Sequence, residues 1–337
     1  MPSPEGGPAT STWRWKVAPL GPDLLAVALG CLWLGDAVLQ LQPQMFTSAF
    51  PGQVLYSAAL MYQPPGLSNF LLAVARVEAA HLWGTTILIA TFQVLIGGAL
   101  LFPRTRRRAL VASAAWAAVI WVLGEGLGFL ATGTASLWSG APGAALLYLA
   151  LSLLALVGMR DGRRFWPAAA WIWTLYWGLG ALLNLPWRYP PGAVMAYNLQ
   201  TAAQSAPGVI REVDFRLAQR AFAFGWPVAL AFIALELLLA AAVWSPRLGR
   251  PALALGLLLD GAFWILGQGL GGVLVGTATD FNSGPLVALL GLVLLTQLPK
   301  RAPRSLHPPA SPGAGAKKRD PAMTYSPTPL PGQYHRR

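Results

Sequence analysis

The sequence has little charge and almost no cysteine. Only 11% of its 337 residues are charged, whereas a soluble domain carries about 25% charged residues. Water is therefore not the main solvent of this chain, 55% of which is hydrophobic. Cys31 is the single cysteine, which excludes an intrachain disulfide and a cysteine metal cluster. The sequence contains no hydrolase elbow, P-loop, haem-attachment or zinc-helix motif, so we expect no soluble-type catalysis and predict no metal.

The few charges are mostly basic and lie in short clusters. Lys and Arg outnumber Asp and Glu by 24 to 12. A basic chain invites a nucleic-acid partner, but these clusters separate apolar segments, as cytoplasmic loops of membrane proteins do. We therefore predict a lipid bilayer as partner and no nucleic acid. The clusters are Arg104 with Arg106, Arg107 and Arg108; Arg160 with Arg163 and Arg164; Arg247 with Arg250; and Lys300 with Arg301 and Arg304.

Eight apolar segments approach the roughly 20 residues that a helix needs to cross a bilayer. If all basic clusters lie inside, both termini are cytoplasmic. The sequence thus predicts an all-α polytopic membrane protein with eight transmembrane helices, in the inner (plasma) membrane. The expected spans are 22–42, 80–102, 109–132, 141–159, 166–186, 222–244, 251–275 and 284–299.

The outer connections are expected at 43–79, 133–140, 187–221 and 276–283. Within the two long ones, residues 50–63 and 194–206 mix apolar and polar side chains. They predict short amphipathic helices at the outer surface, bounded by Pro64-Pro65 and Pro207-Gly208.

An internal repeat divides the chain. With an ungapped offset of 143 residues, Trp121 to Gly128 aligns with Trp264 to Gly271, and Pro142 with Pro285. Each copy holds four helices, an even number, so the repeats are expected to be parallel. The predicted organisation is a disordered segment (1–19), a first four-helix repeat (20–160), a second (161–299) and a disordered basic, Pro-rich tail (300–337).

The repeated segment contains Gly-x-Gly-x-Gly. It resembles a dinucleotide loop, but no strand precedes it. Gly124 and Gly128, like Gly267 and Gly271, are four residues apart, which predicts a helix face for close packing with another helix.

Polar residues within apolar segments are the candidate binding residues. Asp36 and Gln40 are four residues apart on the first helix, and with Glu125 they are expected to line a polar pocket open to the outside. A structural hydrogen bond between helices is the alternative for Glu125, whose counterpart is Gln268. Glu78 and His81 are three residues apart and are expected on one helix face, where they form either an interfacial ion pair or hydrogen bond, or a proton-handling pair. The second copy adds Glu236 and Asp260 as intramembrane carboxylates.

A four-helix unit with an amphipathic outer segment and basic inner turns resembles the DoxX/DoxD-like membrane proteins, and residues 20–298 look like two such units in tandem. The resemblance is one of topology and carries over no residue. It implies quinone-coupled redox chemistry, with a quinone or another small reductant bound near Asp36, Gln40 and Glu125; no other cofactor is evident. The alternatives are a small-solute or ion transporter and a structural subunit of a membrane complex.

Overall fold

The structure, a computed structural model, describes residues 19–298, and every regular element in that range is a helix. The expected disordered segments lie outside this range, apart from residue 19. The all-α prediction is therefore confirmed for the described chain. The α-helices are α1 (Pro22–Gln40), α2 (Tyr56–Leu60), α3 (Pro65–Ala80), α4 (Leu82–Leu101), α5 (Arg106–Leu123), α6 (Ala144–Arg160), α7 (Gly162–Leu183), α8 (Ala193–Ser205), α9 (Gly208–Phe224), α10 (Trp226–Ala242), α11 (Gly249–Ile265) and α12 (Ser283–Gln297). Short helical turns lie between them: η1 (Pro43–Phe46), η2 (Pro51–Leu55), η3 (Gly126–Phe129), η4 (Leu137–Ser139) and η5 (Leu270–Gly272).

A helix stands at each of the eight apolar segments: α1, α4, α5, α6, α7, α10, α11 and α12. Two of them, α1 with 19 residues and α4 with 20, are long and apolar enough to cross a membrane. A third candidate span is α9 with α10, although these two helices are bent by 104° relative to each other. Length and composition alone therefore support two or three spans in the described chain.

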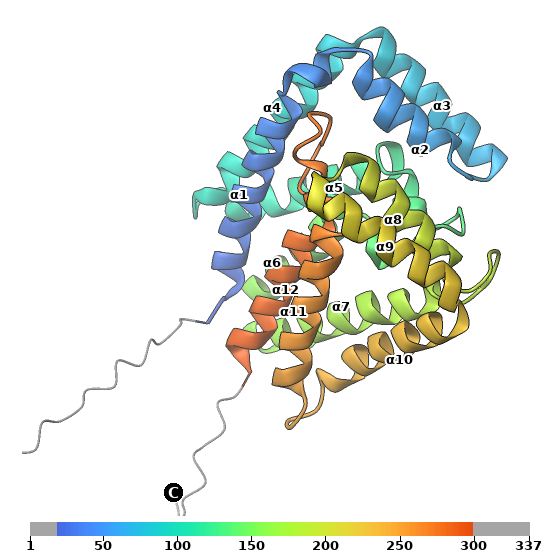
Figure 1. Cartoon of the computed structure of the whole chain (residues 1–337). Coiled ribbons are helices and arrows are strands. Elements are labelled where there is room, and N and C mark those ends of the chain that lie inside the picture. Colours follow the sequence, from blue (N-terminus) through green and yellow to red (C-terminus); the bar gives the residue numbers. More distant parts are fainter. Residues whose placement is uncertain (1–18, 299–337) are drawn as a thin grey trace, which may run out of the picture. The chain divides into compact units, whose positions relative to one another are not determined.

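The two long connections contain more helix than the sequence predicts. The expected short helices at 50–63 and 194–206 are present as η2 with α2 and as α8. The sequence predicts no helix between these prolines and the next span, but α3 and α9 begin directly after Pro64 and Pro207. Proline holds its φ near the helical value and so suits the start of a helix. α2 packs on α3, and α8 on α9, as two helical hairpins (Figure 1).

The Gly-rich segment of the first repeat lies beyond the end of a helix. α5 ends at Leu123, so the expected span 109–132 is too long. The prediction that Gly124 and Gly128 share a helix face is wrong for the same reason. Gly128 has a φ of 61°, and a Cβ there would collide with the carbonyl of Pro142. Only glycine adopts this backbone at no steric cost.

The second repeat shows the same break. α11 ends at Ile265, so the expected span 251–275 is also too long, and Gly267 and Gly271 do not share a helix face. Gly271 has a φ of 70° and lies against the carbonyl of Phe281. In both repeats the Gly-rich segment thus turns the chain, and its glycine allows the backbone of the following loop, at Pro142 or Phe281, to lie directly against it.

The repeat is visible in the contacts, but its offset is not constant. Trp121 donates its indole N–H to the carbonyl of Pro142 at 2.8 Å, and Trp264 donates to that of Phe281 at 2.8 Å. The donors are 143 residues apart and the acceptors only 139. Gly133 and Gly276, both with positive φ, still keep the offset of 143. The ungapped offset is therefore wrong only after them, where it pairs Pro142 with Pro285. α6 starts at residue 144 and α12 at residue 283, which is the same shift.

Each repeat closes as a ring of four helices. α1 and α5 both pack on α4 and α6. In the second repeat, α7 and α11 both pack on α10 and α12. α6 also contacts α7 and α12, which joins the two rings. The helices therefore have equivalent neighbours in both repeats.

Two connections cross between the repeats; we call them the exchanged loops, residues 133–143 and 273–282. The first loop carries Trp138 into the second repeat, where its ring centroid lies 5.6 Å from that of Phe232 and 4.4 Å from that of Phe263. In return, Phe281 of the second loop packs against Gly35 of α1. Each repeat therefore contains part of the other, an arrangement that the sequence does not predict.

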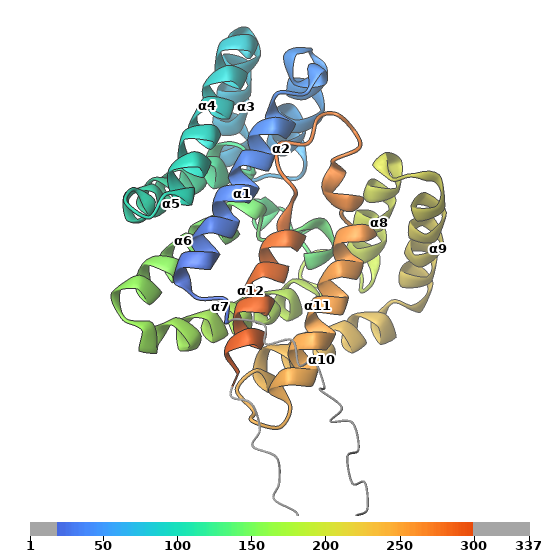
Figure 2. The same cartoon turned by 90° about the vertical axis from the view of Figure 1, so that its left-hand side faces the viewer.

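Both repeats begin and end at the same end of the described chain (Figure 1 and Figure 2). The amide of Leu20, just before α1, donates to the hydroxyl of Thr296 near the end of α12 at 3.1 Å. Pro22 at the start of α1 lies against Gly158 near the end of α6. The turns between α4 and α5 and between α10 and α11 reach this end too. We call it the basic end, because the arginines of the turns between α4 and α5, α6 and α7, and α10 and α11 lie here, whereas Arg211, Arg216 and Arg220 lie on α9.

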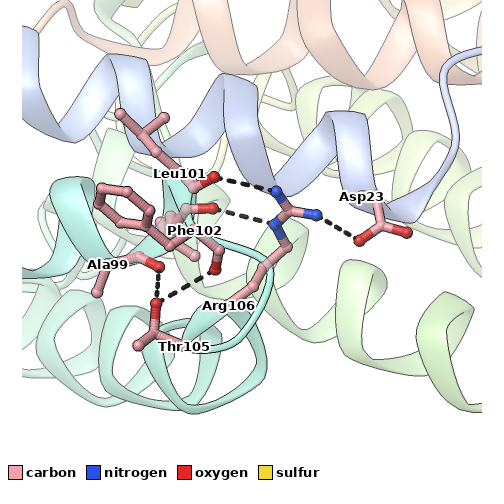
Figure 3. Close-up of polar contacts among 7 residues, drawn as sticks. Asp23, Ala99, Leu101, Phe102, Thr105 and Arg106 are labelled. Carbon is pink, nitrogen blue, oxygen red and sulfur yellow. Dashed lines mark hydrogen bonds and ion pairs between the residues drawn. The ribbon is translucent and has the colours of Figure 1, made fainter.

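Arg106 ties three helix ends together there (Figure 3). Its guanidinium donates to the carbonyls of Leu100 and Leu101 at the end of α4, at 3.0 and 3.2 Å. It also pairs with Asp23 in the first turn of α1 at 2.6 Å. A cation at a helix C-terminus satisfies carbonyls that have no partner within the helix and opposes the negative end of the helix dipole.

Candidate functional site

A cavity of about 400 Å³ opens in the first repeat. Its wall consists of the last turns of α1, parts of α4 and α5, the start of α6, residues around η2, and the second exchanged loop. Because α1 starts at the basic end and the cavity lies at its last turns, the cavity is at the opposite end. Its polar side chains include Asp36, Gln40, Glu78, Gln93, Glu125 and Asp280.

Asp36 is completely buried at 0% exposure. Its Oδ2 accepts a hydrogen bond from the Tyr148 hydroxyl at 2.5 Å, and the Tyr148 ring stacks on Trp33 with centroids 4.1 Å apart. This stack fixes the carboxyl at the cavity wall. The backbone of Phe281 also lies within hydrogen-bonding reach of the Asp36 carboxyl, although Oδ1 forms no hydrogen bond of good geometry with the described residues.

Glu125 follows the end of α5 and reaches the start of α6. Its Oε1 accepts a hydrogen bond from the amide of Ala145 at 2.9 Å. The first amides of a helix have no intrahelical partner and carry partial positive charge, so a carboxylate is favourable there. Gly143 leaves room for this carboxyl, because a Cβ at position 143 would collide with Oε2 of Glu125. Oε2 lies against Gly143 and forms no hydrogen bond of good geometry within residues 19–298, while the amide of Ala144 also stabilises the carboxylate. Glu125 is therefore a structural cap on the first turn of α6.

Two buried amides complete the inner wall. Gln40 is 1% exposed and Gln93 is 3% exposed. Nε2 of Gln40 and Oε1 of Gln93 lack partners in the described chain. The indole N–H of Trp116, another lining residue, is also unpaired there. Asp36 and Gln40 both line the cavity, as their spacing on the helix predicts. The sequence gives no signal for Gln93 and Trp116, because each looks like an ordinary helix residue.

Glu78 and His81 are separated by the end of a helix. α3 ends at Ala80, and His81 is an exposed residue between α3 and α4 with a φ of −122°. The prediction that the two side chains share one helix face is therefore wrong. Glu78 lines the cavity and His81 does not. Burial raises the pKa of the Glu78 carboxyl above its usual range.

Asp280 reaches the cavity from the second repeat through the second exchanged loop. Its Oδ1 accepts from the amide of Asn282 at 2.7 Å, and its Oδ2 accepts from the Thr279 hydroxyl at 2.8 Å. Burial raises the pKa of this carboxyl above its usual range. Asn282 of the same turn caps α12 by accepting from the amide of Ser283 at 2.7 Å, and nothing in the sequence signals that this turn crosses to the other repeat.

The three candidate residues of the second repeat lie away from the cavity. Oε2 of Glu236 accepts from Nδ2 of Asn184 at 2.8 Å. Asp260 is 1% exposed inside α11. Gln268 bridges the repeats: its Nε2 donates to the carbonyl of Leu137 and its Oε1 accepts from the Ser283 hydroxyl, both at 3.3 Å.

The second repeat is filled where the first is hollow. Trp138 from the first exchanged loop packs against Phe232 and Phe263 there. The structure therefore brings Asp36, Gln40, Glu78 and Glu125 to one cavity and leaves Glu236, Asp260, Gln268 and His81 outside it. The described residues contain no group of three or more His, Cys, Asp or Glu side chains that could hold a metal ion.

No known protein family, curated protein or solved structure matches this chain. The assignment of a function therefore depends on the chemistry of the cavity and on the surface of the helices.

Proposed function

We propose that the chain is a multi-pass membrane protein that binds a small molecule in the cavity of its first repeat. The observation that carries this proposal is the cavity itself, whose buried polar atoms on Asp36, Gln40 and Gln93 have no partner within the described chain. Buried polar groups are nearly always hydrogen-bonded. A volume of about 400 Å³ lies within the usual range for small-molecule sites.

The outward faces of the helices support a lipid environment. On α4, the exposed side chains include Trp83 at 66% and Leu95 at 62%. On α10, α11 and α7, Leu237, Leu258 and Leu175 are likewise exposed. Soluble monomers rarely expose large contiguous apolar patches, whereas a bilayer accommodates them. All eight helices of the two rings are proposed to span it, the shorter ones within a tilted bundle.

The basic end is proposed to face the cytoplasm, which follows from the positive-inside rule. The cavity then opens toward the outer side of the plasma membrane. The helical hairpins α2–α3 and α8–α9 lie at the outer surface in this orientation. Their position is supported by the bend of 104° between α9 and α10, because a helix so bent relative to its neighbour cannot continue the same span.

A single-cysteine experiment tests the orientation. Cys31→Ser removes the only cysteine, and one cysteine is then placed at Val209 on α9 or at Arg163 next to the basic end. In intact cells, a membrane-impermeant maleimide should label the first variant and should label the second only after permeabilisation. Labelling of Arg163→Cys in intact cells would contradict the proposed orientation.

The resemblance to the DoxX/DoxD-like proteins makes a quinone or another small reductant the first ligand class to test. Duroquinone should raise the melting temperature of the detergent-purified protein, and Asp36→Asn should remove the effect. A small-solute transporter is the second candidate, favoured by the buried carboxyls Glu236 and Asp260. It predicts solute or proton movement in sealed liposomes that Asp260→Asn abolishes. A purely structural subunit would show neither property and would copurify with a fixed partner.

A further inference from the structure

We propose that the ligand of this cavity is an organic cation: a protonated amine or a quaternary ammonium ion with an apolar or aromatic body. The inference rests on the proposed function, since it names the ligand class of the same site. It derives from the charge of the lining, from the aromatic wall and from the spacing of the carboxyls.

The lining is acidic and has no basic partner. Asp36, Glu78, Glu125 and Asp280 contribute four carboxyl groups, and the residues that line the cavity include no Lys, Arg or His. Burying an ionised carboxylate is costly unless an opposite charge or several hydrogen-bond donors accompany it. A cationic ligand supplies that charge, whereas an anion would add to the repulsion.

Individual atoms support a bound ligand independently of the total charge. Asp36 is 0% exposed, and its Oδ1 is unpaired at the cavity wall. Oε1 of the buried Gln93 and Oε2 of Glu125 are also unpaired. These three atoms are hydrogen-bond acceptors, which a donor or a cation satisfies. The unpaired donors of the same wall, Nε2 of Gln40 and the indole N–H of Trp116, require an acceptor instead.

Aromatic rings form much of the remaining wall. Trp33, Phe50, Trp116, Phe129 and Tyr148 all line the cavity. The stack of Trp33 on Tyr148 lies directly beside the Asp36 carboxyl. Aromatic faces attract ammonium groups, with the largest effect for Trp, and recognition of quaternary ammonium ions uses such walls.

A metal ion does not fit the same residues. The carboxyls come from α1, α3, the end of α5 and the second exchanged loop, and no three of them are arranged to ligate one ion within residues 19–298. A cation with its charge on a larger body interacts with carboxyls on several walls at once. The volume of about 400 Å³ lies within the range of small-molecule sites and is enough for a compact amine.

Equilibrium binding to the full-length protein in nanodiscs tests the inference. The probe is benzyltrimethylammonium, and the comparison ligand is neopentylbenzene, which has the same shape with carbon in place of the charged nitrogen. The cation should bind at least tenfold more tightly than the neutral compound. Asp36→Asn and Glu125→Gln should each weaken cation binding at least tenfold. Asp214→Asn, a buried carboxyl of α9 that does not line the cavity, should leave it unchanged.

The outcomes separate the two proposals. Equal affinity for the cation and its neutral isostere, or unchanged cation affinity in folded Asp36→Asn and Glu125→Gln variants, overturns the organic-cation inference. Binding of duroquinone without binding of the cation also overturns it, while the proposed small-molecule site stands. If cation, neutral isostere and quinone all fail to bind protein that is monodisperse by size exclusion, both proposals fail.

Discussion

Phe281 packs its ring against Gly35 of α1, although the two residues belong to different repeats. A Cβ on Gly35 would lie 2.5 Å from Cε2 of Phe281, so the loop and the helix are in direct contact. This contact holds the second exchanged loop over the cavity and places Asp280 in its wall. Gly35 therefore helps to determine which residues line the cavity of the first repeat, because it leaves the space that Phe281 occupies.

Gly35→Leu should therefore displace the loop and weaken cation binding. Overpacking of this kind costs about 1–3 kcal/mol, and the loss of Asp280 removes one carboxyl from the cavity. The melting temperature and the affinity for benzyltrimethylammonium should both fall. Gly98→Leu is the matched control, because a Cβ on Gly98 of α4 meets nothing within 4 Å. Equal effects of the two substitutions would show that the contact with Phe281 does not matter.

Arg106→Ala should destabilise the protein by about 2 kcal/mol, since hydrogen bonds to a charged group are worth about 1.5–3 kcal/mol and two α4 carbonyls lose their donor. Asp23→Ala should cost under about 1 kcal/mol, because the Asp23 side chain is 76% exposed. Arg107→Ala removes a neighbouring exposed arginine and serves as control. Melting temperatures in one detergent give the order, and a larger effect of Asp23→Ala would contradict it.

Trp138→Ala tests the first exchanged loop. Removing a buried aromatic side chain costs about 3–5 kcal/mol, and Trp138 is 5% exposed between Phe232 and Phe263. The variant should lose most of its monodisperse fraction after purification. Trp187→Ala, which removes a tryptophan that is 73% exposed, should behave as wild type. A stable Trp138→Ala variant would mean that the second repeat is held together without the loop.

Asp214 should make stability depend on pH. It is 0% exposed on α9 with neither carboxyl oxygen paired in the described chain, and burial raises its pKa to about 6. Folding raises the pKa of Asp214, so the protonated carboxyl favours the folded state. This contribution to the free energy of unfolding is fully present below about pH 3.9, the usual aspartate pKa, and is lost as the pH rises through about 6. The limit is about 3 kcal/mol, from two pKa units at 1.36 kcal/mol each.

The measurement is the melting temperature at pH 5 and pH 8. The wild-type value should fall between these two conditions, and Asp214→Asn should flatten the change. Glu212→Gln is the control on the same helix, because Glu212 is exposed and pairs with Arg216 within the helix. A wild-type melting temperature that rises from pH 5 to pH 8 would give the opposite sign and exclude this role for Asp214.

Much of the fold can be predicted from local patterns. The eight apolar runs each contain a helix, because hydrophobic length is a property of a short segment. The arginine clusters that follow α4, α6 and α10 lie at the basic end, because an even number of helices brings the chain back to the end at which α1 begins. The polar wall that includes Asp36 and Gln40 follows from helical spacing. These features need only neighbouring residues and the helix period.

The features that the sequence does not predict all depend on contacts between distant residues. Gly128 turns into the left-handed region because the carbonyl of Pro142 lies against it, and the continuous apolar pattern hides that break. Asp280 belongs to the cavity only because its loop crosses to the other repeat. The helices after Pro64 and Pro207 are not predicted from the sequence, because proline both ends and starts helices.

The exchanged loops have a consequence for how such a chain can arise. A four-helix unit standing alone would have no second repeat to receive its loop, so it could complete its packing only by pairing with a copy of itself. Such a pair would have the arrangement of the present chain, in which each half contributes its loop to the other. In a single chain the two copies need not have identical sequences. Glu125 accepts a hydrogen bond from the amide of Ala145 at the start of α6, whereas the equivalent Gln268 donates to the carbonyl of Leu137 in the first exchanged loop. The two halves therefore differ at this position, and only the first contains the cavity lined by Asp36, Gln40 and Glu125.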